Sequence, residues 1–220
     1  MYKKILLASL LLVLITVSAF AAAPKIIPIS IDDLEDGNVI TSPNWWSFDA
    51  IKLKVVSARE YEISDLGKYV LDVSGKAKGW YVGGFGMYLA QPVDKYTHIQ
   101  IDVCGTGENS GKLKIELSED DNGNKKIEQD ISKNYAPTKD DKFSYELPID
   151  WKGWKQLLIP LKEFEDINPG VGNDTWDPDN RNGSGGLIQF QFIVIGTKET
   201  ADTNFKLDNI KIVKYEGSEE

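Results

Sequence analysis

Hydrophobic residues alternate with polar residues along most of the chain after residue 22. Ile99, Ile101 and Val103, for example, alternate with His98 and Gln100. A period of two puts apolar side chains on one face of a β-strand and polar side chains on the other. Turn residues separate these runs, and no long stretch has helical spacing. The pattern predicts an all-β protein, a jelly-roll β-sandwich of two antiparallel sheets. Further strands are expected around Leu71, Ile115, Tyr145, Ile159 and Phe190.

The apolar phase changes within the last strand-like run, residues 205–212. Apolar residues occupy odd positions up to Leu207 and even positions from Ile210 onward. One extra residue at Asp208–Asn209 explains the change, so a β-bulge is predicted there. Because a bulge re-aims a side chain, Asp208 is expected to point towards the acidic N-terminal edge of the sheet.

That acidic edge is the segment 31–37, which holds four carboxylates in seven residues and ends at a glycine. Carboxylates that meet without basic partners favour a cation, and an oxygen-rich site suits calcium. Asp208 and this segment therefore suggest a calcium site. The alternative is that both are solvated strand ends, and the spacing alone does not decide between the two.

Residues 1–21 resemble a secretory signal peptide. Lys3 and Lys4 precede an apolar run, and small residues lead up to a cleavage point after Ala21. The run is too short for a membrane span. We therefore expect a secreted protein, extracellular or periplasmic, with one β-sandwich domain over residues 22–220.

Charge limits the classes of partner. The formal charge is −9, and loss of Lys3 and Lys4 with the signal peptide would take it to −11. Nucleic acid and anionic membranes are poor partners for such a chain. Arg59 and Arg181 are the only arginines, so the chain has few guanidinium groups that could bind carboxylates or phosphates through paired hydrogen bonds. A neutral ligand fits better.

The lone Cys104 has no partner for an internal disulfide and is interpreted as a small buried residue.

Two loops interrupt the strand pattern. Residues 119–126 superficially resemble a calcium loop, but the EF-hand pattern requires Gly at position six and Glu at position twelve. Counted from Asp120, those positions are Lys125 and Ile131, so this segment is interpreted as a polar hairpin turn. The second loop, 166–186, is long enough to suggest a functional role.

Aromatic and amide residues suggest the ligand. Adjacent strand residues face opposite sides, so two neighbouring tryptophans cannot both be in the core of a one-sided sheet. Trp80 lies among glycines, and Trp176, in the 166–186 loop, either pins that loop to the core or serves as a ligand platform. Gln189 and Gln191 alternate with apolar residues, and they either contact a sugar or form the solvent-exposed face of the sheet. Rings cover the C–H face of a pyranose and amides bind its hydroxyls. The candidate ligand-binding residues are Trp45, Trp46, Trp80, Trp176, Gln189 and Gln191.

Several segments of the chain, in their order along the sequence, resemble those of galactose-binding-like jelly rolls. The resemblance is greatest to family-11-type carbohydrate-binding modules and complex I intermediate-associated protein-30-like domains. The resemblance spans nearly the whole mature chain and rests on residues 31–37, 45–46, 96–107, 154–164 and 207–210. It implies a structural calcium held by Glu35 and Asp208, with Asp33 as a further ligand. Because fold analogy does not establish function, the sugar-contacting residues are not carried over.

Three classes of function fit these features. The first is a non-catalytic protein that binds a neutral polysaccharide or cell-surface glycan on a concave sheet face. The second is a surface or matrix protein that self-assembles through its sheets. The third is a jelly-roll polysaccharide-degrading enzyme, which needs a positioned acid and base. The only histidine, His98, reads as an ordinary strand residue, so we expect a binding protein without catalytic activity.

Overall fold

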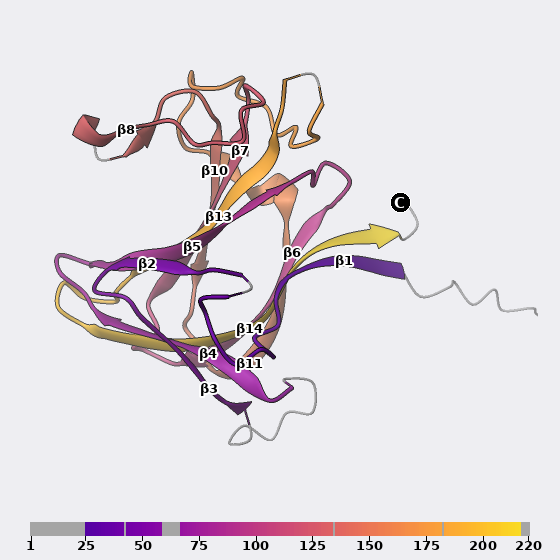
Figure 1. Ribbon diagram of the computed structural model, residues 1–220. Coiled ribbons are helices and arrows are strands. Elements are labelled where there is room, and N and C mark those ends of the chain that lie inside the picture. The colour runs from indigo at the N-terminus through magenta and orange to yellow at the C-terminus, as the bar shows by residue number, and fades with distance from the viewer. Residues whose placement is uncertain (1–24, 42, 59–66, 134, 182, 217–220) are drawn as a thin grey trace, which may run out of the picture.

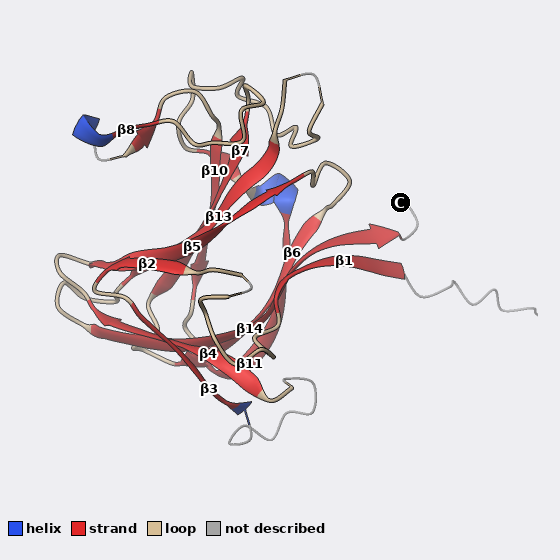
Figure 2. Ribbon diagram, in the orientation of Figure 1, coloured by secondary structure: helices blue, strands red, loops and turns tan. Residues whose placement is uncertain are grey.

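Two large antiparallel sheets make up the computed structural model (Figures 1 and 2), which describes residues 25–41, 43–58, 67–133, 135–181 and 183–216. Sheet A has the strand order β11-β6-β14-β4-β3, and β1 also pairs with β14; sheet B has the order β12-β10-β7-β13-β5-β2. The strands of sheet A are β1 (Lys25–Asp32), β3 (Lys52–Ser57), β4 (Tyr69–Lys76), β6 (His98–Thr106), β11 (Lys152–Pro160) and β14 (Asp202–Glu216). Those of sheet B are β2 (Trp46–Asp49), β5 (Tyr81–Gln91), β7 (Lys112–Asp120), β10 (Lys142–Pro148), β12 (Glu165–Asp166) and β13 (Gly186–Ile195).

Little other regular structure occurs in the described residues. A two-stranded ribbon pairs β8 (Gln129–Asp130) with β9 (Ala136–Pro137), and two 3-10 turns lie at Ile131–Lys133 and Leu161–Glu163. No helix in this part of the chain is long and apolar enough to cross a membrane. The predicted all-β jelly-roll sandwich is confirmed.

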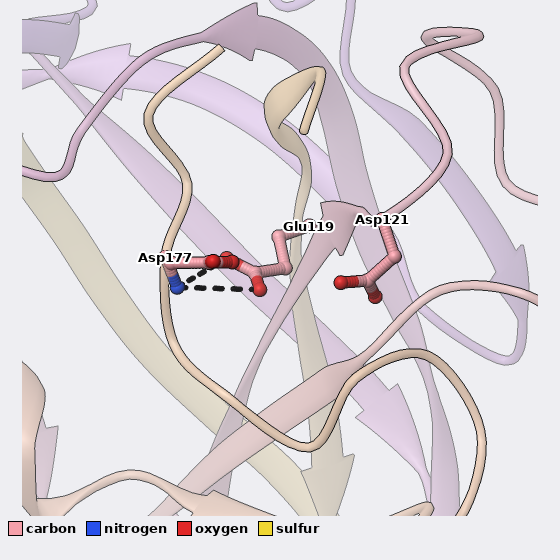
Figure 3. Close-up of side chains that lie close together, drawn as sticks. All are labelled: Glu119, Asp121 and Asp177. Atoms are coloured by element: carbon pink, nitrogen blue, oxygen red, sulfur yellow. Dashed lines mark hydrogen bonds between the residues drawn. The ribbon is translucent and has the colours of Figure 1, made fainter. Parts of the chain in front are cut away.

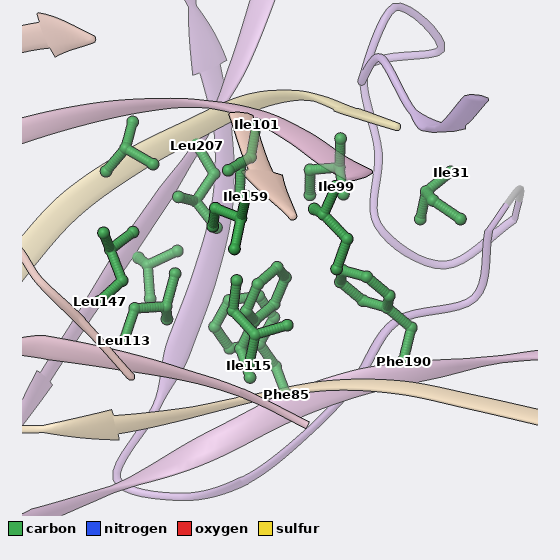
Figure 4. Packing of buried hydrophobic residues seen from close by; sticks show 14 of the residues in the cluster. Ile31, Phe85, Ile99, Ile101, Leu113, Ile115, Leu147, Ile159, Phe190 and Leu207 are labelled. Carbon is green, nitrogen blue, oxygen red and sulfur yellow. The ribbon is translucent and has the colours of Figure 1, made fainter. Parts of the chain in front are cut away.

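The core lies between the two sheets, and the alternating pattern explains it. The side chains of Ile99 and Ile101 on β6 and of Ile115 on β7 are fully buried. In Figure 4 the residues of sheet A, such as Leu207, point towards those of sheet B, such as Phe85. The apolar phase of the strands of sheet B faces this core, and their polar phase, such as Glu116 and Gln191, lies on the outer face of the sheet.

The predicted β-bulge in the last strand is confirmed. The pairing between β14 and β6 shifts register between Asp208 and Lys211. Asn209 has a φ of 49°, a left-handed conformation that asparagine tolerates better than most residues. The extra residue turns the Asp208 side chain inward, where it is 1% exposed.

Loops gather beyond one end of sheet B. The segments 121–141 and 167–185 both lie past the ends of β7, β10 and β13, in the upper part of Figure 2. At the other side of the molecule β1 and β14 run side by side. The expected signal peptide, residues 1–21, lies outside the described residues, and its cleavage after Ala21 stays a prediction.

Candidate functional site

The outer face of sheet B brings together several of the residues that the sequence singled out. Residues paired across antiparallel strands have side chains on the same face. One row of paired residues crosses five strands in the order Trp46 (β2), Gly86 (β5), Gln191 (β13), Glu116 (β7) and Ser144 (β10). Trp46 and Gln191 therefore share a face.

A second row lies next to the first and contains Tyr88, Gln189, Ser118 and Lys142. The ring centroids of Trp46 and Tyr88 are 4.8 Å apart, with an angle of 49° between the ring planes. Tyr88 is 66% exposed, whereas Gln189 is only 7% exposed. The two aromatic rings thus form a small apolar surface beside the two glutamines. We call Trp46, Tyr88, Gln189 and Gln191 the sheet B face.

A glycine sets the position of the Trp46 ring. Gly86 lies opposite Trp46 in the pairing of β2 with β5. A Cβ at Gly86 would come within 2.9 Å of Cζ2 of the indole ring. Because Gly86 has no side chain, the indole can lie over β5 and beside Tyr88.

The part of these two rows on β7 and β10 carries charged residues, and their opposite charges compensate one another. Glu116 accepts hydrogen bonds from Nε2 of Gln191 (3.0 Å) and from Nζ of Lys142 (3.1 Å), and its second oxygen lies 3.2 Å from Nζ of Lys114. Burial raises the pKa of Glu116, but Lys142 and Lys114 more than offset this and leave the pKa below its usual value. The glutamate therefore stays charged and holds the Gln191 amide in one orientation.

Trp45 does not belong to this face, which corrects the expectation for that residue. It is 4% exposed, and its ring stacks at 6.1 Å from that of Phe192. Its Nε1 donates a hydrogen bond of 2.6 Å to Oδ2 of Asp32. Trp45 is therefore a core residue that directly precedes β2, whereas Trp46, the first residue of β2, faces outward.

Trp80 and Trp176 lie elsewhere. Trp80 is 49% exposed in the turn before β5 and borders a cavity of about 420 Å³ together with Pro148 and Ile195. Trp176 packs edge-on against Phe143, with centroids 5.2 Å apart. Since Phe143 is part of the core, Trp176 has the contact expected of a residue that pins its loop to the core.

Near the predicted calcium site, the bulge brings Asp208 close to other carboxylates. Oδ2 of Asp208 and Oδ1 of Asp102 are both buried without a hydrogen-bond partner among the described residues. Burial, together with the charges of Asp102, Glu35 and Asp33, raises the pKa of Asp208 to about 7. Glu35 also accepts hydrogen bonds from the N–H groups of Lys68 and Tyr69, at 2.7 and 3.2 Å. Two orphaned buried oxygens fit a cation, although Asp33, Glu35 and Asp208 do not form a preassembled trio of oxygens in the described residues.

Such a trio occurs at the loop end of sheet B. Glu119, Asp121 and Asp177 each offer an oxygen, and the three oxygens lie within 4.8 Å of one another. Figure 3 shows the Glu119 carboxylate between the other two. This cluster can hold a metal ion. Two of its members, Glu119 and Asp121, come from the segment 119–126, for which the sequence predicts a polar hairpin turn.

The sequence reasoning missed three groups in these sites. Tyr88 and Glu116 were visible as polar-phase residues of their strands, since Met87 and Ile115 beside them are apolar. Asp177 lies 56 positions after Asp121 in the sequence, and no local pattern joins them.

Comparison with known proteins supports the fold. No protein-family model matches this sequence, and no curated protein sequence matches it significantly. A family 11 carbohydrate-binding module of a cellulosomal cellulase of Clostridium thermocellum is similar in structure, with a TM-score of 0.55 and 18% identity over 89% of this chain and 98% of that one. The family 11 module from Clostridium thermocellum in complex with a β-1,3-1,4-mixed-linked tetrasaccharide has a TM-score of 0.54 and 17% identity, over 88% and 98% of the two chains.

The resemblance to complex I intermediate-associated protein-30-like domains is not tested by these matches and stays a prediction. Identities of this size carry over the fold and not the ligand. The chain therefore has the jelly-roll fold of the family 11 carbohydrate-binding modules, as its sequence motifs predicted.

Proposed function

We propose that this protein binds a neutral polysaccharide on the sheet B face and has no catalytic activity. The observation that carries the proposal is the placement of Trp46 and Tyr88 beside Gln189 and Gln191 on one outer sheet face. Aromatic rings bury the C–H face of a pyranose, and amides exchange hydrogen bonds with its hydroxyls.

The polar half of the face also favours a neutral ligand. Glu116 is already paired with Lys114 and Lys142, so these two lysines are not free to bind an anionic sugar. With a formal charge of −9 for the whole chain, an acidic polysaccharide would be repelled. Binding should be weak, because sugar hydroxyls exchange water for protein partners at little net gain and ring contact supplies most of the surplus.

Two features support the absence of catalysis. The only histidine, His98, lies on β6 in sheet A, the sheet that does not carry the proposed face. On the sheet B face itself, the carboxylate that bonds Gln191 is Glu116, whose pKa is lowered by its lysines, whereas a general acid at this face requires a raised one. Incubation with common polysaccharides should therefore release no reducing ends.

The test of binding is affinity electrophoresis in gels that contain a polysaccharide. A β-1,3-1,4-mixed-linked glucan is the first ligand to try, because a structurally similar module was solved with a tetrasaccharide of that linkage. Tyr88→Ala should abolish retention and leave the melting temperature nearly unchanged, since Tyr88 is 66% exposed. Trp46→Ala should also lose retention.

The matched control is Trp80→Ala, which removes a half-exposed Trp at the other end of the strands and should keep retention. Loss of retention in Trp80→Ala, with Tyr88→Ala and Trp46→Ala unaffected, would show that the face is wrongly assigned. A carboxylated polysaccharide run in parallel should retain none of these proteins.

We also propose a structural calcium ion bound between the N-terminal acidic segment and β14. Its support is the pair of orphaned buried oxygens on Asp102 and Asp208 and the nearness of the Glu35 and Asp33 charges. Glu35, Asp208 and Asp33 would hold the ion, which would neutralise carboxylates that otherwise repel one another. Chelation should lower the melting temperature.

The proposed setting is outside the cytoplasm, after removal of residues 1–21. N-terminal sequencing of the exported protein should begin at Ala22. A retained N-terminus in that fraction would contradict the proposal.

A further inference from the structure

Two loops and two strand ends converge beyond the edge of sheet B. Glu119 is the next-to-last residue of β7, Asp121 follows that strand, and Asp141 immediately precedes β10. Asp177 comes from the 167–185 loop, and its N–H donates to both carboxylate oxygens of Glu119, at 3.3 and 3.1 Å. Asp141 also belongs to this group, because its N–H donates to Oδ2 of Asp121 at 2.8 Å.

One carboxylate oxygen of this group is buried and unused. Asp141 is fully buried; its Oδ2 accepts hydrogen bonds from the N–H groups of Asn173 and Thr175. Its Oδ1 has no partner within the described part of the chain. A Cβ at Gly172 would collide with this Oδ1 and with Oδ2 of Asp121, so the two oxygens face the same small space. A buried polar atom without a partner is costly and calls for a ligand.

The charge of the group is not compensated by protein cations. None of the ion pairs between described residues includes Glu119, Asp121, Asp141 or Asp177. Burial raises the pKa of Glu119 to about 9, with further contributions from the Asp121, Asp177 and Asp141 charges. Burial likewise raises the pKa of Asp121 to about 6. The carboxylates repel one another unless a cation or protons neutralise them.

We infer that Glu119, Asp121 and Asp177, with Asp141 beside them, form a calcium site that clamps the 167–185 loop to the ends of β7 and β10. Oxygens within 4.8 Å of one another can share one calcium ion, whose bonds of about 2.3–2.6 Å allow separations up to about 5 Å. Magnesium, with bonds of about 2.0–2.1 Å and a strict octahedral geometry, would require the oxygens to move closer together. The ligands are all hard oxygens, which disfavours softer transition metals.

A cation here would fix the conformation of the loop. The loop is already tied to β7 by the Asp177 N–H and to the segment before β6 by a hydrogen bond of 2.8 Å from the Val93 N–H to the Pro178 carbonyl. Trp176 directly precedes Asp177 and contacts Phe143. Binding would therefore stabilise both the loop and the contact of Trp176 with the core.

The test is calcium titration calorimetry on chelator-treated full-length protein. Asp208→Asn disables the other proposed calcium site and isolates this one. We expect that variant to bind one calcium ion per chain, and the added change Asp177→Asn to weaken binding at least tenfold. Asp202→Asn, an exposed carboxylate on β14, is the matched control and should bind as its parent does.

Two further readouts separate a calcium ligand from a merely structural residue. Without calcium, the double variant Asp208→Asn/Asp177→Asn should melt no lower than Asp208→Asn, because Asp177→Asn removes one of the crowded charges. Calcium at about 100 times its Kd should raise the melting temperature of Asp208→Asn by roughly 5–10 °C and should slow trypsin cleavage after Arg181 in the loop. Both calcium effects should disappear in the double variant.

The inference is overturned if Asp208→Asn binds no calcium, or if Asp177→Asn leaves calcium affinity and trypsin protection unchanged. If Asp208→Asn does not fold, Glu35→Gln takes its place, because Glu35 belongs to the same proposed calcium site near β14 and its side chain is exposed.

Discussion

Two neighbouring tryptophans show how one residue of strand phase separates a core role from a surface role. Trp45 is 4% exposed and bonded to Asp32, while Trp46 lies on the outer face beside Tyr88. The sequence predicted that they face opposite sides. It did not predict which one is buried, because that depends on which face of β2 the core covers.

Substitution of Trp45 should therefore affect stability and not ligand binding. Trp45→Ala should lower the free energy of unfolding by about 3–5 kcal/mol through loss of buried contacts. Trp45→Phe keeps a ring but leaves Oδ2 of Asp32 without the indole N–H, at a cost of about 1–3 kcal/mol. Denaturant unfolding measures both values. Trp46→Phe is the control and should cost less than Trp45→Phe; the reverse order would contradict the assignment.

At the scale of elements, the bulge in β14 decides where the carboxylates of sheet A meet. Asp208 pairs with Asp102 across β14 and β6, and the register shifts directly after this pair. Asn209, in the bulge, donates from Nδ2 to Oδ2 of Asp102 at 2.9 Å. The bulge thus lets one strand bury Leu207 and Ile210 on the same side while Asp208 is turned into an acidic site.

Asn209 is the position at which the bulge can be tested. Asn209→Gly and Asn209→Val both remove the hydrogen bond to Asp102, but only valine must adopt a φ near 49° with a branched side chain. We expect Asn209→Val to be less stable than Asn209→Gly by about 1–2 kcal/mol. Denaturant unfolding of the two variants measures the difference, and equal stabilities would mean that the left-handed residue is not required.

At the scale of the whole molecule, two acidic sites lie in different parts of the sandwich. One joins the N-terminal segment to β14 in sheet A, and the other joins the 167–185 loop to β7 in sheet B. Calcium at both would hold together segments that are far apart in the sequence.

Chelation of Asp177→Asn protein isolates the site in sheet A. A calcium ion that binds only the folded chain at about 100 times its Kd adds roughly 2.7 kcal/mol, so chelator should lower the melting temperature by about 5–10 °C. Asp208→Ala should remove this sensitivity, and the control Asp202→Asn should keep it. Melting curves that coincide with and without chelator would exclude calcium at this site.

Much of the fold followed from local pattern. The alternation of apolar residues predicted the strands, and the phase change at Asp208–Asn209 predicted the bulge, because a strand with one buried face leaves a strict period of two in the sequence. The same phase rule placed Gln189 and Gln191 on the face opposite Phe190 and Phe192, and the register of the strands then set the two glutamines beside Trp46.

The remainder depended on contacts between distant segments. The sequence alone could not bring Asp177 to Glu119 and Asp121, or pair Glu116 with Lys142 and Gln191, because loop paths and strand order carry no local signal. For the same reason Trp80 and Trp176, which composition grouped with Trp46, lie apart from it. The sequence by itself determined the strands and which side chains of a strand share a face; only the tertiary structure decided which face the core covers and which faces and carboxylates meet, since that depends on strand order and loop packing.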